Sequence, residues 1–199
     1  MRFLVRRDPV AFLARGDKLA ERGDHDGAIA AYRRAAGSGH PKVTAEAGVR
    51  LGTALRRAGE PAKAAAAYRA VMSTGDPDQT PRAAYLLGEV LTDTSHFDEA
   101  VAAYEVVIGT GHALRPDALV RLAEVQWYDL HDRAAAIAAY ERAIDSGAPA
   151  TAPCAMLGLA DVLCDDDPER AADLYRRAAD SGHAEAAPIA RQALRQLGG

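Results

Sequence analysis

Ala100-Val101-Ala102-Ala103-Tyr104, followed seven residues later by Gly111, is one of five copies of an Ala-x-x-x-Tyr pattern along the 199-residue chain. The five tyrosines stand at positions 32, 68, 104, 140 and 175, so successive copies are separated by 36, 36, 36 and 35 residues. A fixed period of this length is typical of stacked supersecondary units and not of a single globular core. The sequence therefore predicts an array of repeats. The other copies are Ala28, Tyr32 and Gly39; Ala64, Tyr68 and Gly75; Ala136, Tyr140 and Gly147; and Ala171, Tyr175 and Gly182.

The spacing inside each copy predicts two helices. Ala100 and Tyr104 are four residues apart, which places them one turn apart on the same helical face. Upstream lies a second pattern, Leu87-Gly88 followed by Leu91, which recurs as Leu51-Gly52 and Leu55. A glycine inside a helix costs roughly 1 kcal/mol relative to alanine, so its repeated use indicates a close helix crossing. Each unit is expected to be two antiparallel helices, the first with Leu-Gly or Leu-Ala and the second with Ala-x-x-x-Tyr.

These motifs resemble the tetratricopeptide repeat, whose signature joins Leu-Gly in a first helix to Ala-x-x-x-Phe/Tyr in a second. The resemblance covers residues 8–186 and implies an all-α fold. The fold expected is a right-handed α-α superhelix, a solenoid of five helix-turn-helix repeats plus a C-terminal capping helix. Repeat four departs from the pattern, reading Ala123-x-x-Gln126, and we expect its one extra residue in the turn. The expected segments are an N-terminal lead-in at 1–7, repeats at about 8–41, 42–80, 81–115, 116–151 and 152–186, and a capping helix at 187–199.

Capping residues and prolines indicate where the helices begin. Asp8, Thr44 and Asp167 are expected N-caps, and Pro188 is expected to open the last helix with Ile189 and Leu197 on its packed side. The ten helices expected within the repeats end near 22, 37, 58, 73, 93, 109, 129, 145, 164 and 180.

The composition bears on partners and location. The formal net charge is −4, which disfavours nucleic-acid binding because phosphate contacts need clustered Lys and Arg. Cys154 and Cys164 lie ten residues apart in one expected helix, too far to form a disulfide, which fits a reducing compartment. The apolar start is too short for a signal peptide, and no apolar run approaches the length of a membrane span. We expect a cytoplasmic protein with no membrane partner.

Sequence motifs for catalysis, metal or cofactor binding are missing. His40, His112 and His183 occupy equivalent loop positions, so they are expected to form a row and not to converge. The sequence has no His-x-x-x-His, Cys-x-x-Cys or glycine-rich phosphate loop. The run 165–167 of three aspartates is interpreted as a solvated turn. We therefore expect no enzymatic activity, no cofactor and no metal.

The resemblance implies that the first helices line a concave groove in which a peptide lies. Stepping along these helices by i, i+4 and i+7 gives the candidate groove residues. They are Asp17, Val49, Thr53, Arg56, Tyr85, Glu89, Val120, Glu124, Trp127, Tyr128, Leu157 and Asp161.

Four of these groove positions form an acidic column: Asp17, Glu89, Glu124 and Asp161. Acids beside aromatic anchors suit a protein or peptide that carries Lys or Arg among apolar residues. The alternative is that the acids only keep an exposed face soluble. The same acids disfavour the family's mode of clamping a C-terminal carboxylate, which needs Lys, Arg and Asn in these places.

The leading interpretation is a non-catalytic protein–protein interaction scaffold of the bacterial type, binding a peptide or protein segment in the concave groove. The alternative is a regulatory or sensor domain that binds a signalling peptide or a small ligand. Self-association stays open, because the ends and groove of a repeat array can accept another copy.

Overall fold

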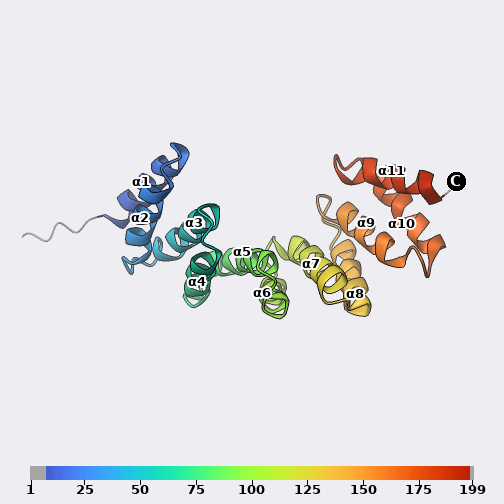
Figure 1. The fold of residues 1–199 in the computed structure, drawn as a ribbon, viewed down its shortest axis with the longest axis horizontal. Coiled ribbons are helices and arrows are strands. Elements are labelled where there is room, and N and C mark those ends of the chain that lie inside the picture. Colours follow the sequence, from blue (N-terminus) through green and yellow to red (C-terminus); the bar gives the residue numbers. More distant parts are fainter. Residues whose placement is uncertain (1–7, 198–199) are drawn as a thin grey trace, which may run out of the picture. The chain divides into compact units, whose positions relative to one another are not determined.

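The computed structural model describes residues 8–197. The regular secondary structure in this range is all helical: eleven α-helices and one π-helical turn joined by short turns, with no β-strand. The lead-in expected at 1–7 lies outside the described residues. The elements, labelled in Figure 1 where there is room, are α1 Pro9–Glu21, α2 His25–Ala36, α3 Thr44–Arg57, α4 Pro61–Met72, α5 Gln79–Asp93, α6 Phe97–Thr110, α7 Arg115–Glu124, η1 Val125–Asp129, α8 Arg133–Asp145, α9 Ala152–Leu163, α10 Pro168–Asp180 and α11 Ala186–Leu197.

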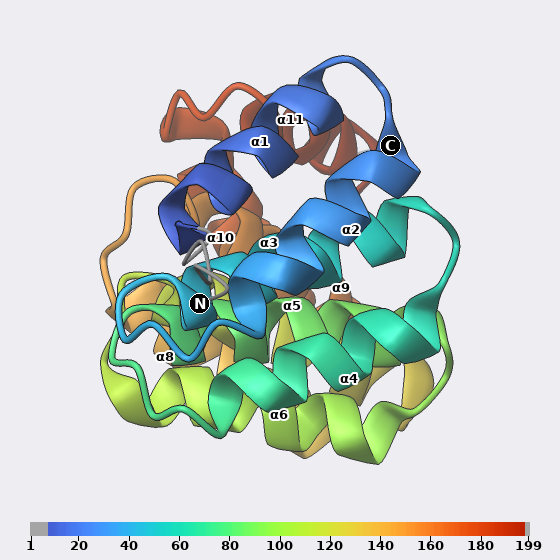
Figure 2. The same cartoon turned by 90° about the vertical axis from the view of Figure 1, so that its left-hand side faces the viewer.

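The chain divides into two compact units, unit 1 ending at Ala103 and unit 2 beginning at Tyr104, so the division falls within α6. In unit 1, α1 packs on α2, α2 on α3, α3 on α4 and α4 on α5, and α3 also contacts α5. Figure 2 faces this unit and shows α1 and α2 side by side. In unit 2 the same sequential packing joins α7 to α8, α8 to α9, α9 to α10 and α10 to α11. Within each unit the helix-turn-helix repeats thus stack as an all-α solenoid.

The repeat tyrosines form the centre of each unit, and small residues make room for them. Tyr68 is fully buried, and Tyr140 is 2% exposed. A Cβ atom added to Gly52 of α3 would lie 2.4 Å from Cε1 of Tyr68 on α4, which no real side chain tolerates. The Leu-Gly motif therefore marks a close helix crossing, as the sequence predicted.

The turns between the two helices of a repeat keep the 36-residue period through repeat four. Their left-handed residues are Gly23 with φ 76°, Gly59 with φ 75°, Ser95 with φ 60° and His131 with φ 55°. Glycine adopts this conformation without steric strain, whereas the Cβ atoms of Ser95 and His131 are strained at a positive φ. The same turn geometry thus recurs with and without glycine.

The extra residue of repeat four lies in the first helix, so its expected place in the turn was wrong. The π-helical segment η1 follows α7 directly, and the amide of Leu130 donates to the carbonyl of Val125 at 3.0 Å. This i to i−5 hydrogen bond accommodates one more residue than an α-helical turn. Because the helix absorbs the insertion, the turn at His131 remains in register with those before it.

Two of the expected N-caps are confirmed and one is wrong. The Asp8 and Asp167 carboxylates accept from the backbone amides of Val10 and Arg170. Thr44 does not cap α3, because the N-cap is Val43 and the Thr44 hydroxyl is buried without a hydrogen-bond partner. The preceding turn, in which the Thr44 amide donates to the carbonyl of His40 at 3.0 Å, already directs the chain into the helix.

The last helix also differs from expectation. It starts at Ala186, and the amide of that residue donates to Nδ1 of His183 at 3.2 Å, so Pro188 is the third residue and not the first. Its packed side consists of small residues, Ala186 among them, while Ile189 and Leu197 are exposed. α11 packs on α9 and α10 through this alanine face. No helix within residues 8–197 is long and apolar enough to cross a membrane.

Candidate functional site

Two acids of the column, Asp17 and Asp161, accept hydrogen bonds from repeat tyrosines. Tyr32 donates its hydroxyl to Asp17 at 2.8 Å, and Tyr175 donates to Asp161 at 2.5 Å. Thr53 occupies the equivalent position in repeat two, and its Oγ1 lies 3.2 Å from the hydroxyl of Tyr68. The signal for this pairing was present in the sequence as a separation of about 15 residues between each column residue and its tyrosine. Asp17 and Asp161 therefore have a structural role in addition to any role in binding.

Arginines of unit 1 neutralise its two column acids. Asp17 forms an ion pair with Arg50, which also binds Glu46 at 2.6 Å. Glu89 on α5 pairs with Arg56 on α3 at 2.5 Å. The Asp17–Arg50 and Arg56–Glu89 pairs join neighbouring repeats, whereas Arg50–Glu46 lies within α3. Because the pairs are solvent-accessible, each contributes about 0.2–1 kcal/mol. The acids of unit 1 are therefore compensated by the chain's own cations.

The apolar groove candidates are less exposed than the helical stepping predicted. Val49 is 5% exposed and Val120 is 8% exposed, so the expectation of exposed side chains is wrong for both. Val120 is covered by neighbouring helices of its own unit, whereas Val49 contributes the little surface it has to a cavity described below. Tyr85 on α5 and Leu157 on α9 are half-buried.

Unit 2 carries a surface that we term the aromatic–acidic patch, composed of Glu124, Trp127, Tyr128 and Asp161. The rings of Trp127 and Tyr128 meet edge to face with centroids 6.4 Å apart. Tyr128 is 58% exposed. Partial burial, followed by the negative charges of Asp161 and Glu124, raises the pKa of Tyr128. The Tyr128 side chain therefore lies within the electrostatic range of both carboxylates.

The two carboxylates of the patch have different partners. Glu124 forms an ion pair with Arg121 at 2.9 Å. Asp161 is exposed and accepts the hydroxyl of Tyr175, but it forms no ion pair among residues 8–197. Burial and the hydrogen bond to Asp161 raise the pKa of Tyr175, so this tyrosine remains a neutral donor. Asp161 is therefore an exposed carboxylate that no cationic side chain among residues 8–197 pairs with.

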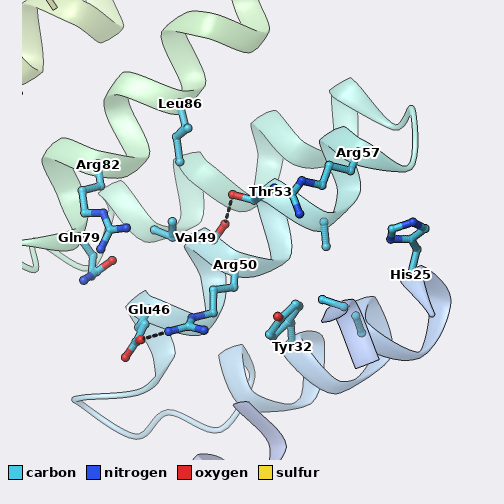
Figure 3. A pocket seen from close by; sticks show the side chains of 13 residues that line it. His25, Tyr32, Glu46, Val49, Arg50, Thr53, Arg57, Gln79, Arg82 and Leu86 are labelled. Carbon is cyan, nitrogen blue, oxygen red and sulfur yellow. Dashed lines mark hydrogen bonds and ion pairs between the residues drawn. The ribbon is translucent and has the colours of Figure 1, made fainter. Parts of the chain in front are cut away.

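Unit 1 carries a cavity of about 380 Å³, which we term the α3 pocket. Its lining includes His25, Val49, Arg50, Arg57, Gln79 and Arg82, contributed by α2, α3 and α5 (Figure 3). The helical stepping missed Arg57, Gln79 and Arg82, because none of them falls on the i, i+4, i+7 positions.

The titratable side chains within residues 8–197 bear on two kinds of site, a metal site and a nucleophilic cysteine. No group of three His, Cys, Asp or Glu side chains in this range could hold a metal ion. Cys154 and Cys164 are both free thiols. Burial raises the pKa of each, whereas a nucleophilic cysteine needs a lowered pKa.

The model of one protein family matches the chain over residues 1–42 and 49–118, more than half of its length, and its description is the tetratricopeptide repeat. The chain belongs to the tetratricopeptide repeat family. Members of this family are generally non-catalytic protein-interaction scaffolds, and the fold implies protein or peptide partners. No curated protein matches the chain.

Solved structures share the fold at low sequence identity. MamA is 22% identical with a TM-score of 0.72, covering 87% of this chain and 91% of its own. PilF of Pseudomonas aeruginosa is 20% identical with a TM-score of 0.71, covering 96% and 88%. YrrB, described as a TPR protein with an unusual peptide-binding site, is 14% identical with a TM-score of 0.70, covering 96% and 94%. These similarities concern the fold alone.

Proposed function

We propose that this tetratricopeptide repeat protein is a non-catalytic scaffold that binds a protein or peptide segment on the faces of its first helices. In unit 2 the aromatic–acidic patch would bind a segment carrying Lys or Arg between apolar residues. The observation that carries this proposal is the exposed Tyr128 ring, which lies within the electrostatic range of Asp161, a carboxylate without an ion pair among the described residues.

The patch offers two attractions for the same cation. A Lys or Arg over the face of an exposed aromatic ring gains about 0.5–1 kcal/mol. A carboxylate beside that ring adds a charge-assisted hydrogen bond. Asp161 and Tyr128 together supply both, and Trp127 next to them adds apolar surface for a neighbouring side chain.

The π-helical turn of repeat four supports a role for this surface. One inserted residue rotates all that follow it in a helix by about 100°, and such insertions occur frequently at functional sites. Trp127 and Tyr128 both lie within η1. The insertion therefore changes the direction of the two aromatic side chains relative to an uninterrupted α-helix. The description of YrrB as having a peptide-binding site also makes a peptide the first ligand class to test.

The experiment measures the binding of a fluorescein-labelled peptide of alternating lysine and leucine by fluorescence anisotropy. Tyr128→Ala and Asp161→Asn should each weaken binding about fivefold, a loss of ~1 kcal/mol, because each removes one attraction for the cation. Asp161→Asn keeps an oxygen that accepts the Tyr175 hydroxyl, so it tests the charge and not the fold. Asp180→Asn, an exposed acid at the end of α10, is the matched control. Equal affinities for all four proteins would reject the patch as the binding site.

Two finer features complete the proposal. A cytoplasmic location is supported by the two free thiols, which suit a reducing compartment. Self-association is supported by Ile189 and Leu197, large apolar side chains exposed on the final helix. Light scattering of the purified protein at two concentrations would measure the second feature directly.

A further inference from the structure

We infer that the α3 pocket of unit 1 binds an acidic segment of a partner protein, one that carries at least two carboxylate side chains separated by apolar residues. The inference rests on the proposed function only in that the ligand is a peptide segment. It concerns a different surface and the opposite charge, because the aromatic–acidic patch lies in unit 2.

The cations of the α3 pocket are of two kinds. Arg50 is committed to Asp17 and Glu46. Arg57 and Arg82 are both exposed, and neither forms an ion pair among residues 8–197. Two guanidinium groups that line a concavity and lack an internal partner attract carboxylates, to which their planar donors fit bidentately.

The two uncommitted arginines lie on opposite sides of the pocket. Figure 3 shows Arg82 beside Gln79 at the start of α5, whereas Arg57 projects from the end of α3 on the side of His25. A carboxylate on each side of the pocket would meet one of the two arginines. The ligand that satisfies both therefore presents two carboxylates, one towards each side.

Gln79 adds an acceptor to these donors. Its Oε1 atom is buried and has no hydrogen-bond partner, although it belongs to a residue that lines the pocket. A buried acceptor without a partner costs free energy. Because this atom is enclosed, the Gln79 side chain must turn before a ligand can donate to it. The main-chain amide of a peptide is such a donor, and a simple dicarboxylate has none.

Apolar side chains between the polar groups indicate what connects the two carboxylates. Val49 and Leu86 line the pocket together with Ala20, Ala28 and Ala54. The lining comes from four helices, α1, α2, α3 and α5, so the pocket extends over three successive repeats. A short extended segment with apolar residues between its acids suits both its composition and its extent.

The experiment measures the binding of a fluorescein-labelled peptide of alternating glutamate and leucine, amidated at its C-terminus. Arg57→Gln and Arg82→Gln should each weaken binding about fivefold, and raised salt should weaken binding to the unaltered protein, because the attraction is between accessible charges. Arg33→Gln, an exposed arginine of α2 outside the pocket, is the matched control and should bind as the unaltered protein does. Circular dichroism melting of each variant verifies that it is folded.

Several outcomes would overturn the inference. A peptide with glutamine in place of glutamate that bound equally well would show that the carboxylates are not recognised. Binding only by a peptide with a free C-terminus would assign the pocket to a terminal carboxylate instead. If the lysine–leucine peptide binds through Tyr128 and Asp161 while the glutamate–leucine peptide does not bind, this inference fails and the proposed function stands. If neither peptide binds, both fail.

Discussion

Unit 1 and unit 2 are built from the same repeat but make room for its tyrosine in different places. In unit 1 the ring of Tyr68 packs against Gly52, which lies on the first helix of the same repeat. In unit 2 the ring of Tyr140 packs against Gly158, where an added Cβ would lie 2.4 Å from Cζ, and Gly158 belongs to the first helix of the following repeat. Repeat four has Ala123 at the position of Gly52. A buried aromatic ring thus fixes the packing, and either neighbouring helix can supply the space.

The two units also differ in the charge of their candidate surfaces. In unit 1 the column acids form ion pairs with Arg50 and Arg56. Arg57 and Arg82 line the α3 pocket and form no ion pair among the described residues. Among the residues that the structure describes, Asp161 of unit 2 forms no ion pair. The hydrogen bond from a repeat tyrosine to a column aspartate occurs in both units. The charge of the surrounding surface nevertheless differs, because it depends on the neighbouring side chains.

The largest expected effect is the loss of a repeat tyrosine. Tyr68→Ala and Tyr140→Ala should each lower the free energy of unfolding by about 3–5 kcal/mol, because both rings are fully buried. Urea unfolding followed by circular dichroism measures the change. Trp127→Ala is the control: Trp127 is only half-buried, so its loss should cost clearly less. An equal cost for Trp127 would remove it from the aromatic–acidic patch.

A smaller effect is expected from filling the spaces beside these rings. Gly52→Ala and Gly158→Ala should each destabilise by about 1–2 kcal/mol, because overpacking outweighs the better helix propensity of alanine. Gly109→Ala in α6, where an added Cβ meets nothing within 4 Å, should instead stabilise slightly.

Double-mutant cycles then sharpen the difference between the units. Gly52 should couple energetically to Tyr68, and Gly158 to Tyr140, because each pair is in contact. The crossed pair of Gly52 and Tyr140 provides the baseline. Coupling of the crossed pair as large as that of the contacting pairs would contradict the assignment.

Alkaline pH should destabilise unit 1 through Tyr32. Burial and the hydrogen bond to Asp17 raise the pKa of Tyr32 from 10.0 to about 12. Below pH 10 the hydroxyl is protonated in both the folded and the unfolded state, so its contribution to stability is fully present. As pH rises from 10 towards 12 the unfolded state loses the proton first, and stability falls.

Tyr32→Phe should flatten the stability profile in this range, measured by urea unfolding at several pH values. Tyr175→Phe provides the comparison in unit 2, because the pKa of Tyr175 is raised by burial and by Asp161, which lacks the arginine that accompanies Asp17. An unchanged slope between pH 10 and 12 in both variants would show that these hydroxyls are not the source of the dependence.

The smallest expected effect concerns the turns. Ser95→Gly in unit 1 and His131→Gly in unit 2 should each stabilise by about 0.5–1 kcal/mol, because glycine adopts their positive φ without strain. Gly59→Ala at the equivalent turn should destabilise by a similar amount. Thermal melting detects both changes. Destabilisation by Ser95→Gly or His131→Gly would mean that their side chains contribute more than the strain costs.

The period of the sequence alone determined the helical repeat, the helix pairs and most of the helix bounds. It could do so because these features depend on local spacing: Ala100 and Tyr104 share a face in any helix, and Asp167 caps the helix that begins at Pro168. The family resemblance followed from the same residues.

Tertiary structure decided which side chains remain available at the surface. The sequence contains Asp17, Glu89 and Asp161 as equivalent acids, but only packing between repeats reveals that the first two face arginines and the third does not. Contacts between residues more than 30 positions apart depend on how the helices stack, which no local pattern records. The α3 pocket, which Arg57 and Arg82 line, could not be predicted from the sequence for the same reason, because helices of successive repeats form it together.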